Sequence, residues 1–409
     1  MSRNTNNSHV PTLRFPGFEG EWKERFLGDS FEERTEKNRD DLPLLSLGEE
    51  GLMLQSDTER KDNSNADKSK YLRVSVDDIA YNTMRMWQGR CVYANIEGIV
   101  SPAYTVCRPK EGIDSLFHYY LFKTKKMIDL FHQNSQGLVS DTLNLKYEAF
   151  SKIKYFLPPT LDEQKKIAAC LSDMDDMIAA QGQKVDALKA HKQGLMQQLF
   201  PQNGETTPCL RFPGFTGEWE EKPLSHFLHE HRTKSDGKCE VHSVSVTKGV
   251  INQVEYLGRS FAAADTSKYN LVKPNDIIYT KSPTGAFPYG IIKQNKNPYN
   301  VIVSPLYAVY TPVTKYLGYI LDSYFENPVN TNNYLSSLVQ KGAKNTIQIS
   351  NDTFVSKAMR LPSEHNEQKK IAECLMALDD SIAAATAKLE ALKSHKKGLM
   401  QQLFPQTNK

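Results

Sequence analysis

The sequence lacks the short motifs by which many enzymes hold phosphates, dinucleotides or metals. Its 409 residues contain no GxxxxGK(S/T) phosphate loop, no GxGxxG that opens a helix and no HExxH pair. Only six residues are cysteine, and none lies in a CxxC pair or among histidines at zinc-finger spacing. We therefore predict no catalytic residue, no metal and no cofactor in this chain, and free thiols in a reducing cytoplasm.

Long hydrophobic runs and a strong net charge are also missing. No apolar run approaches the roughly 18 residues of a membrane span, and residues 1–12 lack the apolar core of a signal peptide. The formal net charge of +3 is too small to indicate a polyanionic partner by itself. We expect a cytoplasmic protein without membrane contact, with a disordered tail at residues 1–12.

Two phrases occur twice in the chain. "LRFPGFEGEW" at residues 13–22 returns as "LRFPGFTGEW" at 210–219, and residues 163–202 return at 367–406 with 28 identities in 40 positions. Since a solenoid needs three or more repeats, this tandem duplication predicts a pseudo-twofold monomer. The predicted parts are a globular region at 13–160, a long helix at 161–202, a linker at 203–209, a second globular region at 210–361 and a second long helix at 362–406.

Both repeated helices carry a seam of apolar residues every 3.5 positions, a spacing typical of coiled coils. Gln181 and Lys192 interrupt the first seam, and Ala385 and Lys396 hold the equivalent positions of the second. The seam residues are Ile167, Leu171, Met174, Ile178, Val185, Leu188, Leu195 and Leu199, then Ile371, Leu375, Leu378, Ile382, Leu389, Leu392, Leu399 and Leu403.

Chain order and charge predict that the two helices pair antiparallel. Each helix is acidic early, at Asp175 and Asp379 among others, and basic late, at Lys192 and Lys396 among others. Antiparallel pairing lays acid against base, whereas parallel pairing lays like on like. The alternatives are that each helix packs only on its own globular region or on another subunit.

The variable regions between the repeated phrases are predicted to be mixed α/β. Residues 69–83 align with 267–281, and 100–109 with 303–312, as short apolar strands, while residues 118–131 are typical of a helix. The predicted fold class is therefore α+β, with two pseudo-symmetric mixed α/β domains separated by a long antiparallel coiled coil of two helices.

The loops differ between the two regions. Residues 82–90 and 280–290 follow equivalent strands, and residues 134–144 and 340–348 form a second set. They are rich in residues that contact phosphates and base edges, although a polar loop is most often only solvated. The candidate DNA-binding residues are Asn82, Thr83, Arg85, Trp87 and Arg90 in the first region, and Lys281, Ser282, Thr284, Lys344 and Asn345 in the second.

Other recurring residues have structural interpretations. Trp22 and Trp219, within the opening phrases, are expected to pack each globular region against a helix end. His191 and His395 coincide between the copies and are expected on helix surfaces. Cys170 and Cys374 also coincide and are expected as small buried hydrophobes. Trp87 has no counterpart, so burial remains open beside a contact role.

This layout resembles the specificity subunit of type I restriction-modification systems. The resemblance covers nearly the whole chain, and its most specific carriers are "LPPTLDEQKKIAACL" at 157–171 and "LPSEHNEQKKIAECL" at 361–375, each opening a long helix. The family's usual phrase has two prolines before the Glu-Gln, and the second copy keeps only Pro362. The paired "LRFPGF…GEW" phrases are similar to those of firmicute members.

The resemblance implies a non-catalytic DNA-recognition subunit. Each variable region would be a target recognition domain for one half of a split, asymmetric DNA sequence, and the coiled coil would set the gap. Two modification subunits, with the S-adenosylmethionine site, and two restriction subunits, driven by ATP and Mg²⁺, would assemble around the chain. The rival hypotheses are a self-sufficient restriction nuclease or methyltransferase, and a coiled-coil scaffold without DNA binding.

Overall fold

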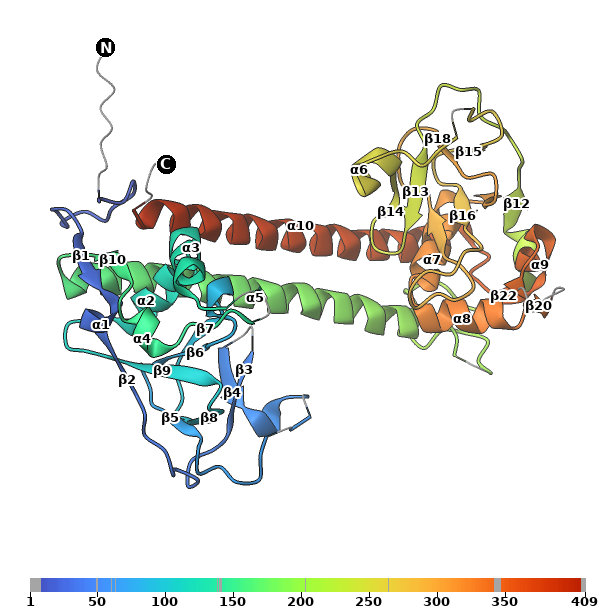
Figure 1. The fold of residues 1–409 in the computed structure, drawn as a ribbon. Coiled ribbons are helices and arrows are strands. Elements are labelled where there is room, and N and C mark those ends of the chain that lie inside the picture. Colours follow the sequence, from blue (N-terminus) through green and yellow to red (C-terminus); the bar gives the residue numbers. More distant parts are fainter. Residues whose placement is uncertain are drawn as a thin grey trace, which may run out of the picture. The chain divides into compact units, whose positions relative to one another are not determined.

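The computed structural model describes residues 9–48, 51–59, 61–62, 64–137, 139, 142–202, 204–263, 265–341 and 347–405. The chain divides into two compact units (Figure 1). Unit 1 comprises Met1–Gly182 and Ala387–Lys409, and unit 2 comprises Gln183–Thr386. Each unit holds one globular region, the first half of the long helix that follows it in the chain, and the second half of the other long helix. Among the described residues, no helix combines the length and apolarity needed to span a membrane.

Unit 1 is built around a four-stranded antiparallel sheet with the order β2-β9-β6-β7. Three two-stranded antiparallel ladders, β1-β10, β3-β4 and β5-β8, accompany it. The strands are Lys23–Phe26 (β1), Phe31–Glu33 (β2), Leu45–Gly48 (β3), Gly51–Leu54 (β4), Leu72–Val74 (β5), Ile79–Asn82 (β6), Cys91–Tyr93 (β7), Gly98–Val100 (β8), Tyr104–Pro109 (β9) and Lys154–Leu157 (β10).

The central strand β6 places alternate side chains in two hydrophobic cores, because successive residues of a strand point to opposite faces. Ile79 and Tyr81 belong to an aromatic core that also contains Trp22 and residues of both long helices. Ala80 belongs to a smaller core with residues of the β3-β4 and β5-β8 ladders. The globular region is thereby seated on the long helices by one face of its sheet.

The helices of unit 1 correct one expectation from the sequence. Residues 118–131 form parts of two helices rather than one, because the Thr124 hydroxyl caps a new helix by accepting a hydrogen bond from the Met127 N–H. The short helices are Leu27–Ser30 (α1), Gln55–Asp57 (η1), Met86–Gln88 (η2), Ser115–Phe122 (α2), Lys125–Asn134 (α3) and Tyr147–Phe150 (α4).

Unit 2 repeats this topology. Its central sheet has the order β12-β19-β16-β17, and its main ladders are β11-β22, β13-β14 and β15-β18. Even the turns before the central strands match, since Asp77 and Asn275 both adopt left-handed conformations with φ of 70° and 71°. The strands are Glu221–Pro223 (β11), Leu228–Glu230 (β12), His242–Ser245 (β13), Gly249–Asn252 (β14), Asn270–Val272 (β15), Ile277–Tyr279 (β16), Ile292–Gln294 (β17), Val301–Val303 (β18), Ala308–Pro312 (β19), Gln340–Lys341 (β20), Ile347–Gln348 (β21) and Ala358–Arg360 (β22).

The cores of unit 2 follow the same rule as those of unit 1. Ile277 and Tyr279 of β16 face the larger core with Trp219, and Ile278 faces the smaller one. Both tryptophans are only 2% exposed, so their predicted packing role is confirmed. The short helices of this unit are Leu224–His226 (η4), Gln253–Leu257 (α6), Lys315–Phe325 (α7), Pro328–Ser336 (α8) and Asn351–Ser356 (α9).

The two long helices, Leu161–Leu199 (α5) and His365–Leu403 (α10), have 39 residues each. In unit 1, Leu403 at the end of α10 lies in one core with Ile167 near the start of α5. In unit 2, Leu199 at the end of α5 lies in one core with Ile371 near the start of α10. The helices therefore pair antiparallel, and the predicted fold class is confirmed.

The predicted seam is the buried side of both helices. Every seam residue is buried or half-buried, and the two polar interruptions of the first seam, Gln181 and Lys192, are buried as well. His191 and His395 are exposed, as predicted. Cys170 and Cys374 are only half-buried, which corrects the expectation of buried thiols.

Candidate functional site

The repeated opening phrase forms a clamp on the start of a long helix. In unit 1 the guanidinium of Arg14 donates two hydrogen bonds to the Glu163 carboxylate, each 2.8 Å long. Trp22 donates its indole N–H to the same carboxylate at 3.3 Å. The Arg14 guanidinium also binds the Gly20 carbonyl at 2.6 Å, which closes the phrase on itself. The carboxylate is buried but fully engaged, as a buried charge must be.

The same clamp recurs in unit 2. Arg211 donates two hydrogen bonds to Glu367, of 2.6 and 2.9 Å, and the Trp219 indole reaches that carboxylate at 3.3 Å. These contacts explain why the phrase and the Glu-Gln of the helix are repeated together: each is the other's binding partner. Both motifs are evident in the sequence, but nothing in the sequence indicates that they contact each other.

Each clamp also holds the end of the other long helix. The Leu13 N–H donates to the Gln402 carbonyl of α10 at 3.0 Å, and the Leu210 N–H donates to the Gln198 carbonyl of α5 at 2.9 Å. Carbonyls in the last turn of a helix have no partner within the helix. The phrase therefore supplies one of the missing donors while its arginine engages the neighbouring helix.

The glutamine after each clamp carboxylate ties the helix to the globular region. Gln164 accepts a hydrogen bond from the Asp114 N–H at 3.0 Å, just before α2. Gln368 accepts one from the Thr314 hydroxyl at 2.6 Å, just before α7. The two contacts occupy equivalent places, so the globular regions are mounted on their helices in the same way.

A second link joins the globular region to both long helices. In unit 1 the Tyr120 hydroxyl donates to Asp175 at 2.8 Å, and Lys396 of α10 donates to the same carboxylate. In unit 2 Tyr319 and Lys192 make the corresponding contacts with Asp379. Burial, together with the hydrogen bond to the carboxylate, raises the pKa of both tyrosines. The predicted acid-to-base pairing of the helices is thus confirmed, whereas the tyrosines were not anticipated.

The loop after β6 contains most of the candidate DNA-binding residues of unit 1. Arg85 and Arg90 are exposed, and within the described residues neither guanidinium has a carboxylate partner. Trp87 is half-buried: its ring lies 5.7 Å from that of His132 in α3, and its indole N–H donates to the Met84 carbonyl at 3.0 Å. The loop is therefore packed on α3 while its arginines extend outward.

The first two candidates fix the base of this loop. The Asn82 side-chain oxygen accepts the Met84 N–H at 2.9 Å. The Thr83 hydroxyl donates to the Ala103 carbonyl at 3.1 Å, and the Leu145 N–H donates to the Thr83 carbonyl at 2.8 Å. Three segments, the loop after β6, the turn before β9 and the segment that follows α3, meet at this point.

The loop after β16 in unit 2 has a different shape and chemistry. Ser282 and Thr284 are exposed, and Thr284 closes a tight turn with Phe287 through two backbone hydrogen bonds of 3.0 and 2.9 Å. Asn332 of α8 donates to the Ala286 carbonyl at 3.1 Å. Helices α3 and α8 thus support equivalent loops, one through an aromatic contact and the other through a hydrogen bond.

Lys281 differs from the other candidates because it is already engaged within unit 2. Its ammonium donates to the side chain of Asn351, which in turn donates to Glu230 at 2.6 Å. Burial lowers the pKa of Lys281. Its role in phosphate contact stays a prediction. Lys344 and Asn345 lie outside the described residues.

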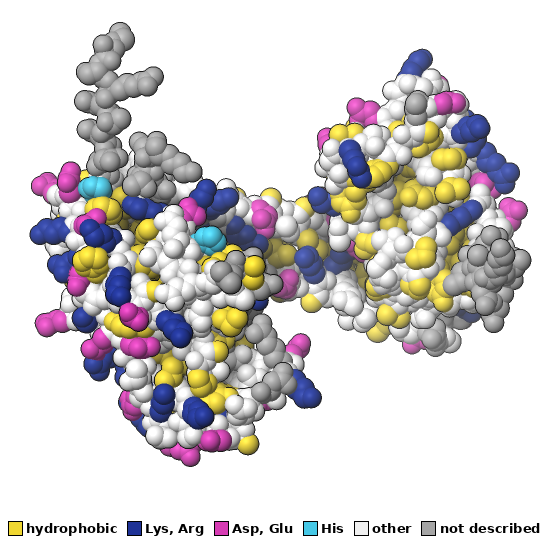
Figure 2. Space-filling model, in the orientation of Figure 1, with side chains coloured by type: hydrophobic (Ala, Val, Ile, Leu, Met, Phe, Trp, Pro, Cys, Tyr) yellow, Lys and Arg dark blue, Asp and Glu magenta, His cyan; other side chains and the backbone are white. Residues whose placement is uncertain are grey.

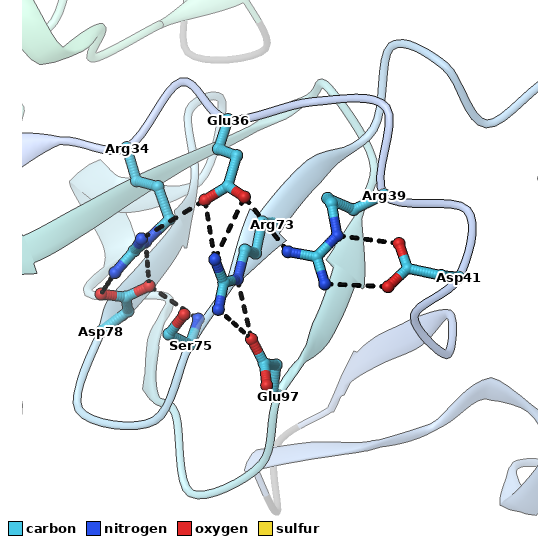
Figure 3. Close-up of polar contacts among 8 residues, drawn as sticks. All are labelled: Arg34, Glu36, Arg39, Asp41, Arg73, Ser75, Asp78 and Glu97. Atoms are coloured by element: carbon cyan, nitrogen blue, oxygen red, sulfur yellow. Dashed lines mark hydrogen bonds and ion pairs between the residues drawn. The ribbon is translucent and has the colours of Figure 1, made fainter.

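Both units anchor the central strand with a buried carboxylate. Asp78 in unit 1 is 1% exposed; it receives two hydrogen bonds from Arg34, of 2.7 and 3.0 Å, and one from the Ser75 N–H at 2.8 Å (Figure 3). Burial raises the pKa of Asp78, and the guanidinium of Arg34 opposes that effect. Asp276 is the counterpart in unit 2, bound by His231 at 2.9 Å and by the Lys273 N–H at 2.7 Å.

Around this anchor, unit 1 adds an ion-pair network that unit 2 does not share. Arg73 joins Glu36 and Glu97, and Arg39 joins Glu36 and Asp41 (Figure 3). Hydrogen bonds from Arg73 lower the pKa of Glu36. The positions of Glu36 and Arg73 are held in unit 2 by Thr233 and Leu271, which keep only the matching backbone hydrogen bond of 2.9 Å. The three arginines of this network, Arg34, Arg39 and Arg73, are all paired with carboxylates, so none of these guanidinium groups is left unneutralised.

One further pair of loops was not predicted from the sequence: residues 55–65 and 253–263, which follow the equivalent hairpins β3-β4 and β13-β14. Their sequences have almost nothing in common, which is why no alignment signal drew attention to them. Among the described residues, no three His, Cys, Asp or Glu side chains are grouped as a metal ion would require.

Comparison with known proteins agrees with this arrangement. The family described as "Type I restriction modification DNA specificity domain" matches residues 19–190, which include the first clamp carboxylate, the loop after β6 and most of α5. Residues 19–190 therefore match the DNA specificity domain family of type I restriction-modification systems, and the chain as a whole is similar to specificity subunits of these systems. The type I restriction enzyme MjaVIII specificity subunit of Methanocaldococcus jannaschii is 24% identical over 365 residues, covering 82% of each chain.

Two solved structures share the fold of this chain. The crystal structure of the type I restriction-modification system S subunit from M. genitalium aligns with a TM-score of 0.61 at 12% identity, over 98% of this chain and 100% of that one. A chain from a structural study of complex assembly and conformational transition of the type I R-M system aligns with a TM-score of 0.52 at 14% identity, over 96% and 99%.

Proposed function

We propose that this chain is a specificity subunit that binds a bipartite, asymmetric DNA target, with one unit on each half-site. The observation that carries the proposal is that the two units share a four-stranded sheet and three two-stranded ladders in the same order but differ in the loops after β6 and β16. Loops on a shared scaffold are where binding specificity usually resides. Two loop sets on one framework therefore predict two different half-sites.

The exposed loop residues suit contacts with duplex DNA. Arg85 and Arg90 can each grip guanine O6 and N7 or a phosphate, because a guanidinium presents paired donors. Ser282 and Thr284 offer hydroxyl groups, which bind phosphates and base edges alike. The chemistry of the two loops differs accordingly, with charged donors in unit 1 and neutral ones in unit 2.

The long helices would scaffold the catalytic partners, two modification and two restriction subunits. S-adenosylmethionine, ATP and Mg²⁺ would belong to those partners, and this chain would bring no cofactor. The last turns of α10 and the opening phrase leave a shallow hollow lined by Leu13, His395 and Gly398 among others. The same residue types recur at Leu210, His191 and Gly194, so both halves offer a similar surface to identical subunits.

An exchange of one globular region tests the proposal. Residues 23–157 would be replaced by the matching region of a relative, and methylated adenines would be mapped by long-read sequencing in cells that contain the modification subunit. We expect one half-site to change and the other to stay. The matched control exchanges residues 220–361 and should alter the opposite half-site. A change of both half-sites by a single exchange would contradict the proposal.

A further inference from the structure

Loops 55–65 and 253–263 are attached at their first residues by equivalent backbone hydrogen bonds. Gln55 and Gln253 each donate their backbone N–H to a carbonyl just before the preceding hairpin, at 2.9 and 3.0 Å. Both loops contain eleven residues, so the framework sets the same starting point and the same length for each.

The hydrogen bonds at the last residues of the two loops are also equivalent. The Asn65 N–H donates to the Tyr71 hydroxyl at 3.2 Å, and the Ala263 N–H donates to the Tyr269 hydroxyl at 3.2 Å. The motifs "ADKSKY" and "ADTSKY" end the two segments. The hydrogen bonds that fix the two ends of these loops are therefore duplicated, whereas the residues between those ends differ.

The residues between these equivalent ends differ in chemical character. Loop 55–65 reads "QSDTERKDNSN", without a single aromatic or large aliphatic residue, whereas loop 253–263 reads "QVEYLGRSFAA". In unit 2 these hydrophobic side chains are not buried; around α6 they lie at the surface beside basic ones (Figure 2). The exposed fractions are 53% for Val254, 39% for Tyr256, 44% for Leu257 and 58% for Phe261.

Loop 253–263 holds its apolar side chains in a defined conformation. Asn252 caps α6 by accepting the N–H groups of Val254 and Glu255, at 2.9 and 3.2 Å. Gly258, in the left-handed conformation with φ of 75°, ends the helix. The Gln253 side chain then accepts the Phe261 N–H at 2.8 Å, which folds the tip back onto the helix. Exposed rings on a fixed backbone bind at a low entropic cost.

Two cations accompany the two rings. The Lys248 ammonium lies 5.6 Å from the centre of the Tyr256 ring, and the Arg259 guanidinium lies 4.5 Å from that of Phe261. Within the described part of the chain neither cation has a carboxylate partner, and both are exposed. The surface thus combines apolar contact area with two positive charges available to an anion.

We propose that loop 253–263 is a recognition loop that places Phe261 and Tyr256 against bases and sugars in a groove of the second half-site, with Arg259 and Lys248 on flanking phosphates. This inference rests on the proposed function. Proteins that insert apolar side chains into the minor groove of DNA commonly also contact the DNA with arginine and lysine side chains. A docking surface for identical partner subunits would have to recur in unit 1, where the equally mounted loop is polar. DNA is therefore the occupant that fits a surface present in one half alone.

Binding of the full chain to duplex DNA tests the proposal, with the target defined by methylation mapping. Three probes are used: the complete target, the target with its first half-site scrambled, and the target with its second half-site scrambled. Phe261→Ala should bind the complete target about tenfold more weakly than the wild type. It should match the wild type on the probe that lacks the second half-site. Arg259→Ala should reduce the salt dependence of binding by about one unit of slope.

Phe26→Ala is the matched control, because Phe26 is also an exposed ring, 43% accessible, with the Lys154 ammonium 5.6 Å from its centre. It lies in the β1-β10 ladder of unit 1 and should leave binding unchanged. Wild-type affinity of Phe261→Ala for all three probes would overturn the proposal, as would a loss confined to association with the modification subunit. Failure of the wild type to distinguish the probes would instead contradict the proposed function.

Discussion

The Lys192 ammonium lies 2.6 Å from the Asp379 carboxylate, although the two residues are 187 positions apart in the chain. Lys192 holds a seam position near the end of α5, and a second carboxylate, Glu326, lies 2.7 Å away. Burial alone would lower the pKa of Lys192, but the two acids raise it. Lys192 interrupts the apolar seam of α5, but its two ion pairs link α5 to α10 and to the globular region of unit 2.

Replacing Lys192 by methionine should destabilise unit 2 by about 1–2 kcal/mol, because Asp379 and Glu326 would repel each other without the ammonium. The estimate is reduced from that of a fully buried pair since Glu326 is half exposed. Thermal unfolding followed by circular dichroism measures the change. Lys189→Met, at an exposed position of the same helix, is the control. Equal melting temperatures for the two variants would contradict a role for the ion pair.

Glu163→Gln should open the clamp of unit 1. The variant leaves the half-buried guanidinium of Arg14 without its bidentate charged partner at the buried position 163, and we expect a loss of about 2–4 kcal/mol. Hydrogen exchange should show faster exchange in the opening phrase and the first turns of α5. Glu19→Gln, an exposed neighbour, should change neither. Exchange that accelerates throughout unit 2 as well would show that the clamp does not act locally.

The stability of unit 1 should fall on mild acidification because of His118. Burial lowers the pKa of His118 to about 4, against an ordinary value of 6.5, and the ring is held by the Asp114 carbonyl and the Tyr155 hydroxyl. Between those values the unfolded chain takes up a proton that the folded chain excludes, so stability decreases as the pH falls from 6.5 towards 4, by up to about 1.4 kcal/mol per pH unit. His118→Gln should flatten this dependence in urea titrations; an unchanged slope would contradict it.

Insertion of four residues into both long helices, after Gln181 and after Ala385, should change the gap between half-sites. Four helical residues add roughly 6 Å, which corresponds to one or two base pairs at ~3.4 Å each. Methylation mapping should then return the same two half-sites with a longer spacer. Retained methylation at the original spacing would exclude the helices as the element that sets the gap.

Arg85→Ala should relax the preference at one position of the first half-site at a cost of about 1–3 kcal/mol if the guanidinium contacts a base. The comparison is Arg73→Ala, whose guanidinium is already bound by Glu36 and Glu97 and should not change selectivity. Competition binding across single-base variants of the target measures both. Wild-type selectivity of the Arg85 variant would remove this side chain from the base contacts.

The sequence was sufficient for features that depend on local periodicity and on the repeat. The seam positions were predicted because a spacing of 3.5 is a property of one helix, and the antiparallel direction followed from charges such as Asp175 and Lys396. The clamp could not be predicted in this way, because Arg14 and Glu163 are 149 positions apart and meet only when the intervening chain has folded. The two helices within residues 118–131 had a local signal, the Thr124 cap, which a single apolar pattern concealed.

The loops show which features could not be predicted from the sequence. The loops after β6 and β16 were found because their flanking strands align, but the engagement of Lys281 by Asn351 depends on a segment 70 positions away. Loops 55–65 and 253–263 could not be paired from the sequence, because they have almost no residues in common. Their equivalence rests on hydrogen bonds at both ends, such as those of Asn65 to Tyr71 and of Ala263 to Tyr269, which form only in the folded chain.

The clamps have a consequence for the order of the chain. In unit 2 the phrase that binds Gln198 follows it on the same stretch of backbone, twelve residues later at Leu210. In unit 1 the equivalent partners, Gln402 and Leu13, make the same hydrogen bond although no peptide segment joins them directly. The same contact is therefore made once between residues joined by a short linker and once between residues near the two ends of the chain. A circular permutant, opened within residues 203–209 and joined between residues 405 and 9, should therefore fold with both clamps in place, although its two halves would be translated in the opposite order.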